Sequence, residues 1–121
     1  VRKLTFTGST ETGKMLLKEC AKTVKKASME LGGLAPFIVF EDANIEAAIA
    51  GAIAAKYRNT GQTCVCANRI YIHQDIYDEF CEGFTKAAAK IQTGEGLDPA
   101  TDQGPLIDEA ALAKVEEHIN D

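Results

Sequence analysis

The chain has no excess of positive charge and no long hydrophobic run, and each absence excludes a class of protein. Its 121 residues include 13 Lys and Arg against 18 Asp and Glu, a net charge of −5. A nucleic-acid-binding surface would be basic, so we expect no nucleic-acid partner. A membrane-spanning helix needs about 20 consecutive apolar residues. The longest apolar stretch, Ile45 to Lys56, is interrupted by Glu46, so we expect no membrane span.

The chain also lacks the cysteine spacing of a disulfide framework. Cys20, Cys64, Cys66 and Cys81 are irregularly placed. Cys20 and Cys81 fall in helical patterns, where cysteine acts as a small buried hydrophobe. No secretory leader pattern is present, so we expect a reducing compartment and free thiols. The predicted location is the cytoplasm, or the mitochondrion if the source is eukaryotic.

Both ends of the sequence are abrupt. Val1 begins almost directly in a strand, and the helical pattern from Asp108 to Asp121 has no C-terminal cap. We therefore expect an internal segment of a longer protein.

The periodicity of the chain predicts an α/β fold. Residues 3–7 and 26–31 read as strands, and the helix between them is capped by Ser9 or Thr10. Such a strand–helix–strand unit pairs its strands in parallel. After a break at 34–36 come a strand (37–40), a helix (42–59, capped by Asp42 or Asn44), a strand (69–73), a helix (75–92), a loop (93–106) and a last helix. The strand at 37–40 is apolar throughout and is predicted to be buried on both faces.

The first turn resembles a phosphate-binding loop without matching one fully. Gly8 to Lys14 fits G-x-x-x-x-G-K, but Met15 stands where such a loop has Ser or Thr for magnesium. N–H groups at a helix N-terminus still favour a phosphate. The alternative is a plain turn between a strand and a helix.

A segment with two cysteines and a single carboxylate are the candidates for catalytic groups. The segment Gly61 to Cys66 reads Gly-Gln-Thr-Cys-Val-Cys, between a helix and a strand. A thiol nucleophile there would need a base that activates water, and Glu30, at a strand end before Gly32 and Gly33, is the candidate. The alternatives are structural thiols and a solvated carboxylate. A lone C-x-C without a second ligand pair nearby is poor spacing for zinc. These residues alone leave open which cysteine reacts.

Arg58 precedes Cys64 by six residues, at the end of the predicted helix. The helix dipole alone favours a cation at this end. A guanidinium is equally suited to clamp a substrate carboxylate, and both interpretations stay open.

Three linked segments resemble the NAD(P)-dependent aldehyde dehydrogenase family. They are Phe6 to Gly13, Glu30 to Gly33 and Gly61 to Cys64, in the order and separation of that family. Within it, Tyr57 to Arg69 resembles the succinate-semialdehyde dehydrogenases.

The resemblance implies a fragment of the aldehyde dehydrogenase fold. Residues 1–34 would form the C-terminal βαβ portion of a Rossmann-like NAD(P)-binding domain, and residues 35–121 part of the catalytic domain. The implied reaction is oxidation of an aldehyde, with succinate semialdehyde as the expected substrate and NAD or NADP as cofactor. The parent protein is expected to be a homodimer or homotetramer.

The resemblance also assigns roles to single residues. Cys64 would be the nucleophile and Glu30 the general base, and Arg58 would bind the distal carboxylate of the substrate. Cys66 matches a second cysteine that can form a disulfide with the nucleophile; the alternative is a packed small residue. No metal site is implied. The expected cofactor-binding residues are Thr7, Gly8, Ser9, Gly13 and Leu31.

The resemblance places parts of the active site outside this chain. The oxyanion asparagine would precede Val1, and the carboxylate that holds the nicotinamide ribose would follow Asp121, so we expect the isolated segment to be inactive. Two other function classes stay open: a cysteine-dependent thioester or ester hydrolase, and a phosphate- or nucleotide-binding module without catalysis.

Overall fold

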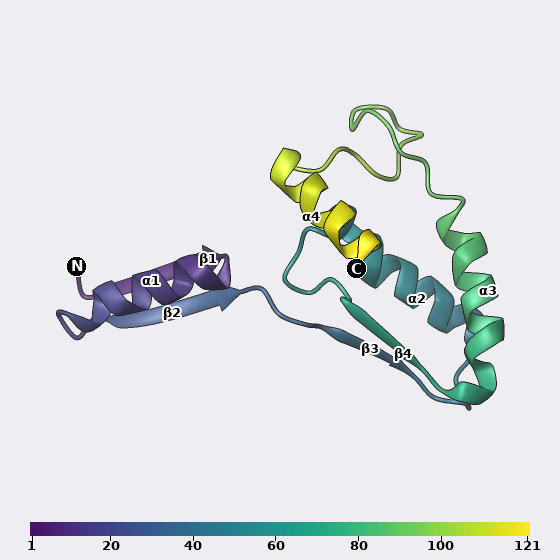
Figure 1. The fold of residues 1–121 in the computed structure, drawn as a ribbon, viewed down its shortest axis with the longest axis horizontal. Helices are drawn as coiled ribbons and strands as arrows, with labels where there is room; N and C mark the ends of the chain where they lie inside the picture. Colours follow the sequence, from purple (N-terminus) through teal and green to yellow (C-terminus); the bar gives the residue numbers. More distant parts are fainter.

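A computed structural model describes residues 1–121, and it confirms the predicted α/β class. The chain forms two separate two-stranded sheets with helices packed against them (Figure 1). Short 3-10 turns, η1 (Arg58–Gly61) and η2 (Gln74–Ile76), follow α2 and precede α3. The strands and helices are β1 (Lys3–Gly8), α1 (Thr10–Ala21), β2 (Lys26–Leu31), β3 (Pro36–Val39), α2 (Ile45–Tyr57), β4 (Arg69–Ile72), α3 (Tyr77–Ala88) and α4 (Glu109–Asn120).

The first unit is the predicted parallel βαβ unit. β1 pairs with β2 in parallel, with Thr7 opposite Glu30. Helix α1 begins where the Ser9 side chain accepts the Thr12 backbone N–H at 3.2 Å, so Ser9 is the cap. Alternate strand residues face α1, and the others, including Glu30, are exposed.

The second unit is a parallel β3–β4 pair covered on one face by α2 and α3. Its buried centre is Val39, Ala52 and Phe80. Asn44, one of the two predicted caps, accepts the Ala47 N–H at 2.9 Å and starts α2.

The predicted burial of residues 37–40 on both faces is wrong. Val39 is 4% exposed, whereas Ile38 is 58% and Phe40 62% exposed. The two helices cover one face of the pair, and a strand presents alternate side chains to opposite faces. The apolar side chains on the other face are therefore uncovered in this chain.

Two helices are shorter than their predicted ranges. Helix α2 ends at Tyr57 instead of 59 because Asn59 and Thr60 have left-handed backbone angles. Helix α3 occupies Tyr77–Ala88 within the predicted 75–92. The last predicted helix is α4, capped by the Asp108 carboxylate, which accepts the Ala111 N–H at 2.8 Å.

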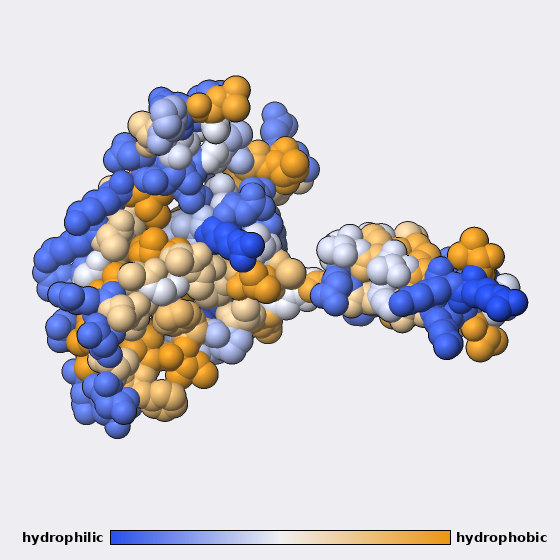
Figure 2. Space-filling model, turned by 180° about the vertical axis from the view of Figure 1, so that it is seen from behind, coloured by the Kyte–Doolittle hydropathy of each residue, from blue (hydrophilic) through white to orange (hydrophobic).

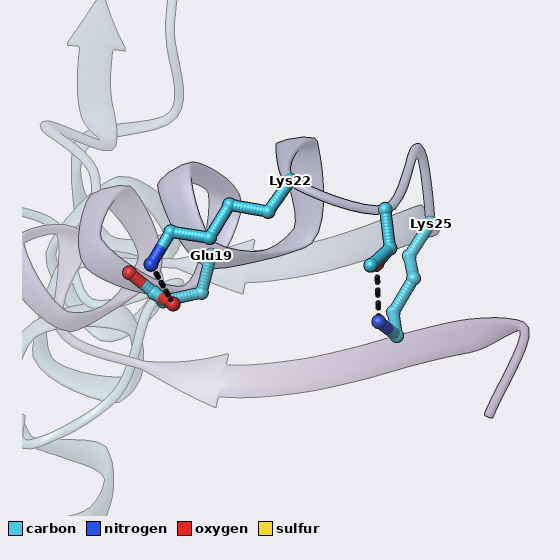
Figure 3. Close-up of polar contacts among 4 residues, drawn as sticks. Glu19, Lys22 and Lys25 are labelled. Carbon is cyan, nitrogen blue, oxygen red and sulfur yellow. Dashed lines mark hydrogen bonds and ion pairs between the residues drawn. The ribbon is translucent and has the colours of Figure 1, made fainter.

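Exposed ion pairs lie on the surfaces of the helices. Lys22 contacts Glu19 at 2.7 Å at the end of α1, and Lys25 donates to Thr23 in the turn that follows (Figure 3). On α3, a hydrogen bond from Lys86 lowers the pKa of Glu82. Such solvated pairs contribute little to stability, so the fold depends on the apolar contacts of each unit.

Figure 2 shows the two units as separate lobes joined by a narrow connection, which is the segment 32–35 between β2 and β3. None of the helices combines the length and the apolar character that crossing a membrane requires.

Candidate active site

The two units meet at a hollow of about 490 Å³, where the end of the β1–β2 sheet faces the loop before β4. We call residues 62–68 the cysteine loop. The hollow brings together five of the residues predicted from the sequence: Thr7, Gly8, Glu30, Leu31 and Cys64. Its other lining residues are Gly32, Gly33, Gly61, Gln62, Thr63 and Asn68.

Parallel pairing explains why Thr7, Gly8 and Glu30 share this edge. Thr7 is opposite Glu30 and Gly8 is opposite Leu31, so both strands present their carboxyl ends to the hollow. Open α/β sheets bind ligands at this end. Glu30 lies on the sheet face opposite α1 and is exposed, within reach of solvent water.

Exposure distinguishes the two cysteines of the loop. Cys64 is exposed and lines the hollow. Cys66 is 4% exposed, and its thiol donates to the Lys56 carbonyl oxygen at the end of α2, at 3.2 Å. The thiol that a substrate in this hollow can reach is therefore that of Cys64, a distinction the sequence left open.

Backbone bonds fix the far end of the cysteine loop. The Ala67 N–H donates to Ala55 of α2 at 3.2 Å, and the Asn68 N–H donates to Ala35 at 3.0 Å. The loop is thereby tied to both a helix and the connection between the two units.

A left-handed turn leads into the cysteine loop. Asn59, Thr60 and Gly61 have φ angles of 50°, 56° and 76°. Gly tolerates this region, Asn does so less readily, and a β-branched residue such as Thr60 is an outlier there. The turn redirects the chain from the axis of α2 toward the hollow.

Two glutamines without a predicted role hold this turn. The Gln62 side-chain oxygen accepts the Ile107 N–H at 2.9 Å, and the Gln103 amide donates to the Tyr57 carbonyl at 2.8 Å. Gln62 also lines the hollow. The only sequence signal was the proximity of Gln62 to Cys64; nothing in the sequence pointed to Gln103.

Four predicted site residues lie outside the hollow. Ser9 caps α1, and Cys66 is a buried residue of the cysteine loop. Gly13 packs against Leu31: a Cβ on Gly13 would approach Leu31 Cδ2 to 2.7 Å, so the glycine permits close helix–strand contact. Arg58 is exposed and lines a different hollow of about 450 Å³. The catalytic, binding and redox roles of all nine predicted site residues stay predictions.

The edge at Gly8 fits a nucleotide better than a metal ion. No three His, Cys, Asp or Glu side chains are grouped as metal ligands. Nothing lies within 4 Å of where a side chain on Gly32 or Gly33 would begin, so a ligand can approach the backbone closely. The N-terminus of α1 beside Gly8 favours phosphate.

Comparisons with known proteins agree with this geometry. The chain is 61% identical to a glutarate-semialdehyde dehydrogenase of Pseudomonas putida and 60% identical to an NADP(+) succinate-semialdehyde dehydrogenase of Escherichia coli. Each alignment covers all of this chain and 25% of the relative, so the chain spans about a quarter of their length.

Solved structures share the fold of this chain. The crystal structure of an NADP-dependent enzyme of E. coli superposes with a TM-score of 0.98 at 60% identity, over 100% of this chain and 25% of that one. A Staphylococcus aureus betaine aldehyde dehydrogenase in complex with NAD+ gives 0.96 at 36% identity, over 99% and 24%. The model of the aldehyde dehydrogenase family matches residues 1–121, and the chain therefore belongs to the aldehyde dehydrogenase family.

Proposed function

We propose that the full-length protein oxidises a small aldehyde to its carboxylic acid with NAD or NADP, through a covalent intermediate on Cys64. The observation that carries this proposal is the hollow shared by the exposed Cys64, the exposed Glu30 and the glycine edge of β1 and β2. Residues 1–34 would contribute to the cofactor domain and residues 35–121 to the catalytic domain.

Cys64 begins the reaction as a thiolate. Its sulfur bonds to the aldehyde carbon, and the carbonyl π electrons move to the oxygen, giving a thiohemiacetal oxyanion. The Cys64 backbone N–H is a suitable donor to that oxygen. NAD or NADP, when bound, would supply the hydride acceptor for oxidation of the thiohemiacetal to a thioester. Thr7, Gly8, Ser9, Gly13 and Leu31 are the residues proposed to hold it.

Glu30 completes the reaction. Its carboxylate takes a proton from water, and the water oxygen attacks the thioester carbon. The carbon–sulfur bond then breaks, the acid leaves, and Cys64 is again a thiolate. The exposed position of Glu30 at the edge of the hollow suits a residue that must meet both solvent and the acylated sulfur.

The relatives suggest the substrate class. Their names refer to glutarate semialdehyde, succinate semialdehyde and 3-sulfolactaldehyde, each an aldehyde with an anionic group at the other end. We propose succinate semialdehyde as the substrate here, with Arg58 as the anchor of its carboxylate. A homodimeric or homotetrameric assembly and a cytoplasmic or mitochondrial location stay predictions.

The test is turnover by the full-length enzyme carrying Cys64→Ser, with Cys81→Ser as the matched control. Cys81 is half-buried on α3 and does not line the hollow. We expect Cys64→Ser to lose at least about 10³-fold in kcat, because the nucleophile is removed, and Cys81→Ser to stay within twofold. Acid formation without absorbance at the reduced-nicotinamide band would indicate the hydrolase instead. Nucleotide binding without either reaction would indicate a binding module.

A further inference from the structure

The left-handed turn at Asn59, Thr60 and Gly61 determines where the cysteine loop begins. All three residues have positive φ angles, and two of them carry side chains that oppose this conformation. A turn of this kind persists only where neighbouring groups hold it, and such turns gather at functional sites. The groups that hold the left-handed turn therefore also determine the position of the loop that carries Cys64.

Local bonds close the turn but do not fix it to the rest of the protein. The Gln62 backbone N–H donates to the Asn59 carbonyl at 3.1 Å, and the Asn59 side-chain amide donates to the Gln62 carbonyl at 3.1 Å. These bonds join residues within the turn, which could move as one piece.

The fixing bonds come from the loop 93–107, more than 40 residues further along the chain. Gln103 Nε2 donates to the Tyr57 carbonyl at 2.8 Å, immediately before the turn. The Ile107 N–H donates to Gln62 Oε1 at 2.9 Å, immediately after it. The turn is thus held on both sides, and the Thr60 hydroxyl adds a longer contact to the Gly104 carbonyl at 3.5 Å.

Gln103 is itself well anchored. Its backbone N–H donates to the Gln92 carbonyl at 3.0 Å, and its carbonyl accepts the Gly94 N–H at 3.0 Å. Its Nε2 also donates to the Asp102 carbonyl at 3.0 Å, while Oε1 is buried without a partner. The amide is therefore used as a donor, and neither a carboxylate nor a thioether can replace it.

We propose that Gln103 is a positioning residue for Cys64. It holds the C-terminal end of α2 against the loop 93–107. The left-handed turn and the cysteine loop, which follow α2 in the chain, are held with it. The proposal rests on the proposed function, because it assumes that Cys64 is the nucleophile. Gln103 does not line the hollow of Cys64. It lines the hollow of Arg58, and its bond to α2 is made to the backbone carbonyl of Tyr57, so the proposed effect on Cys64 passes through the backbone.

The test uses the full-length enzyme with Gln103→Met and Gln103→Glu, both of which keep the length of the side chain and remove the donor. Gln92→Met is the matched control, because that side chain bonds only to the nearby Lys90 carbonyl. The readout is the single-turnover rate of nicotinamide reduction per titratable Cys64 thiol, together with the dissociation constant of the cofactor, well below the unfolding temperature.

We expect both Gln103 variants to lower the single-turnover rate about 10-fold, since small misplacement of a reacting group has effects of this order or larger. Cofactor affinity should be unchanged, and Gln92→Met should match the wild type. A merely structural role would lower the thermal midpoint and leave the rate per thiol unaltered.

Two outcomes separate the proposals. If both Gln103 variants reduce the nicotinamide within twofold of the wild-type rate while Cys64→Ser is inactive, Gln103 is not a positioning residue. If Cys64→Ser still turns over, the proposed function fails, whatever the Gln103 variants show.

Discussion

At the scale of single residues, burial separates two cysteines that the sequence leaves equivalent. Cys64 is open to the hollow, whereas the Cys66 thiol is buried and bonded to the Lys56 carbonyl. A disulfide between them stays a prediction, and it requires the Cys66 thiol to leave that bond. Neighbours at i and i+2 close a very small ring, so such a disulfide would be strained and easily reduced.

Arg58 carries a residue-scale prediction about substrate choice. If its guanidinium binds the distal carboxylate, Arg58→Met should lower kcat/KM for succinate semialdehyde about 10- to 100-fold, corresponding to the ~1.5–3 kcal/mol of a charged hydrogen bond. Kinetics with butanal, which lacks the carboxylate, should change little. Arg2→Met at the exposed start of the chain is the control. An equal loss on both aldehydes would refute the role in recognition.

The sequence singled out Glu30 and the cysteine segment by their residue types, and Thr7, Gly8 and Leu31 through the family resemblance; the roles of all these residues stay predictions. Thr7, Gly8, Glu30, Leu31 and Cys64 do share one hollow. Gln103 could not be predicted, because its bond to Tyr57 joins positions 46 residues apart. Arg58 lines a different hollow. It precedes the left-handed turn and stays at the end of α2, whereas the turn carries the following residues toward the hollow of Cys64.

At the scale of elements, the parallel pairing and the caps followed from the sequence, and the turns did not. Ser9 and Asn44, each one of the two predicted caps, start α1 and α2, because capping depends on a few neighbouring groups. The predicted end of α2 at 59 is two residues too late, because no Gly or Pro stands between Tyr57 and Gly61 to mark the end and the left-handed angles of Asn59 and Thr60 are not visible in the sequence. The predicted burial of 37–40 on both faces is wrong because burial depends on which layers cover the sheet, which is a tertiary property.

Gly61 carries the element-scale prediction. Its φ is 76°, and a Cβ there would lie 3.4 Å from the Lys56 carbonyl oxygen and 3.6 Å from Cys66 Sγ. Gly61→Ala in the full-length protein should therefore lower the free energy of unfolding by about 1–2 kcal/mol, from left-handed backbone strain. Gly96→Ala is the control, because nothing lies within 4 Å and its φ is unexceptional. Urea denaturation compares the two, and equal stabilities would contradict the role of the turn.

At the scale of the whole molecule, the chain is two small units with most of their surface open. Its accessible surface is 9300 Å², whereas a compact protein of 13.0 kDa exposes about 6,300 Å². The relatives are about four times longer, so the uncovered apolar face of β3 and β4 has material to pack against in a longer protein. The inactivity of the isolated segment stays a prediction, consistent with an active site shared between units.

The central claim is that Cys64 and Glu30 act in sequence, one forming the thioester and the other releasing it. The most direct test is Glu30→Gln in the full-length enzyme, mixed with succinate semialdehyde and NAD or NADP and quenched within one turnover. We expect a burst of about one reduced nicotinamide per subunit, then slow turnover, and an acyl group on Cys64 by peptide mass spectrometry. Undiminished steady turnover without an adduct, or an adduct on Cys66, would contradict it.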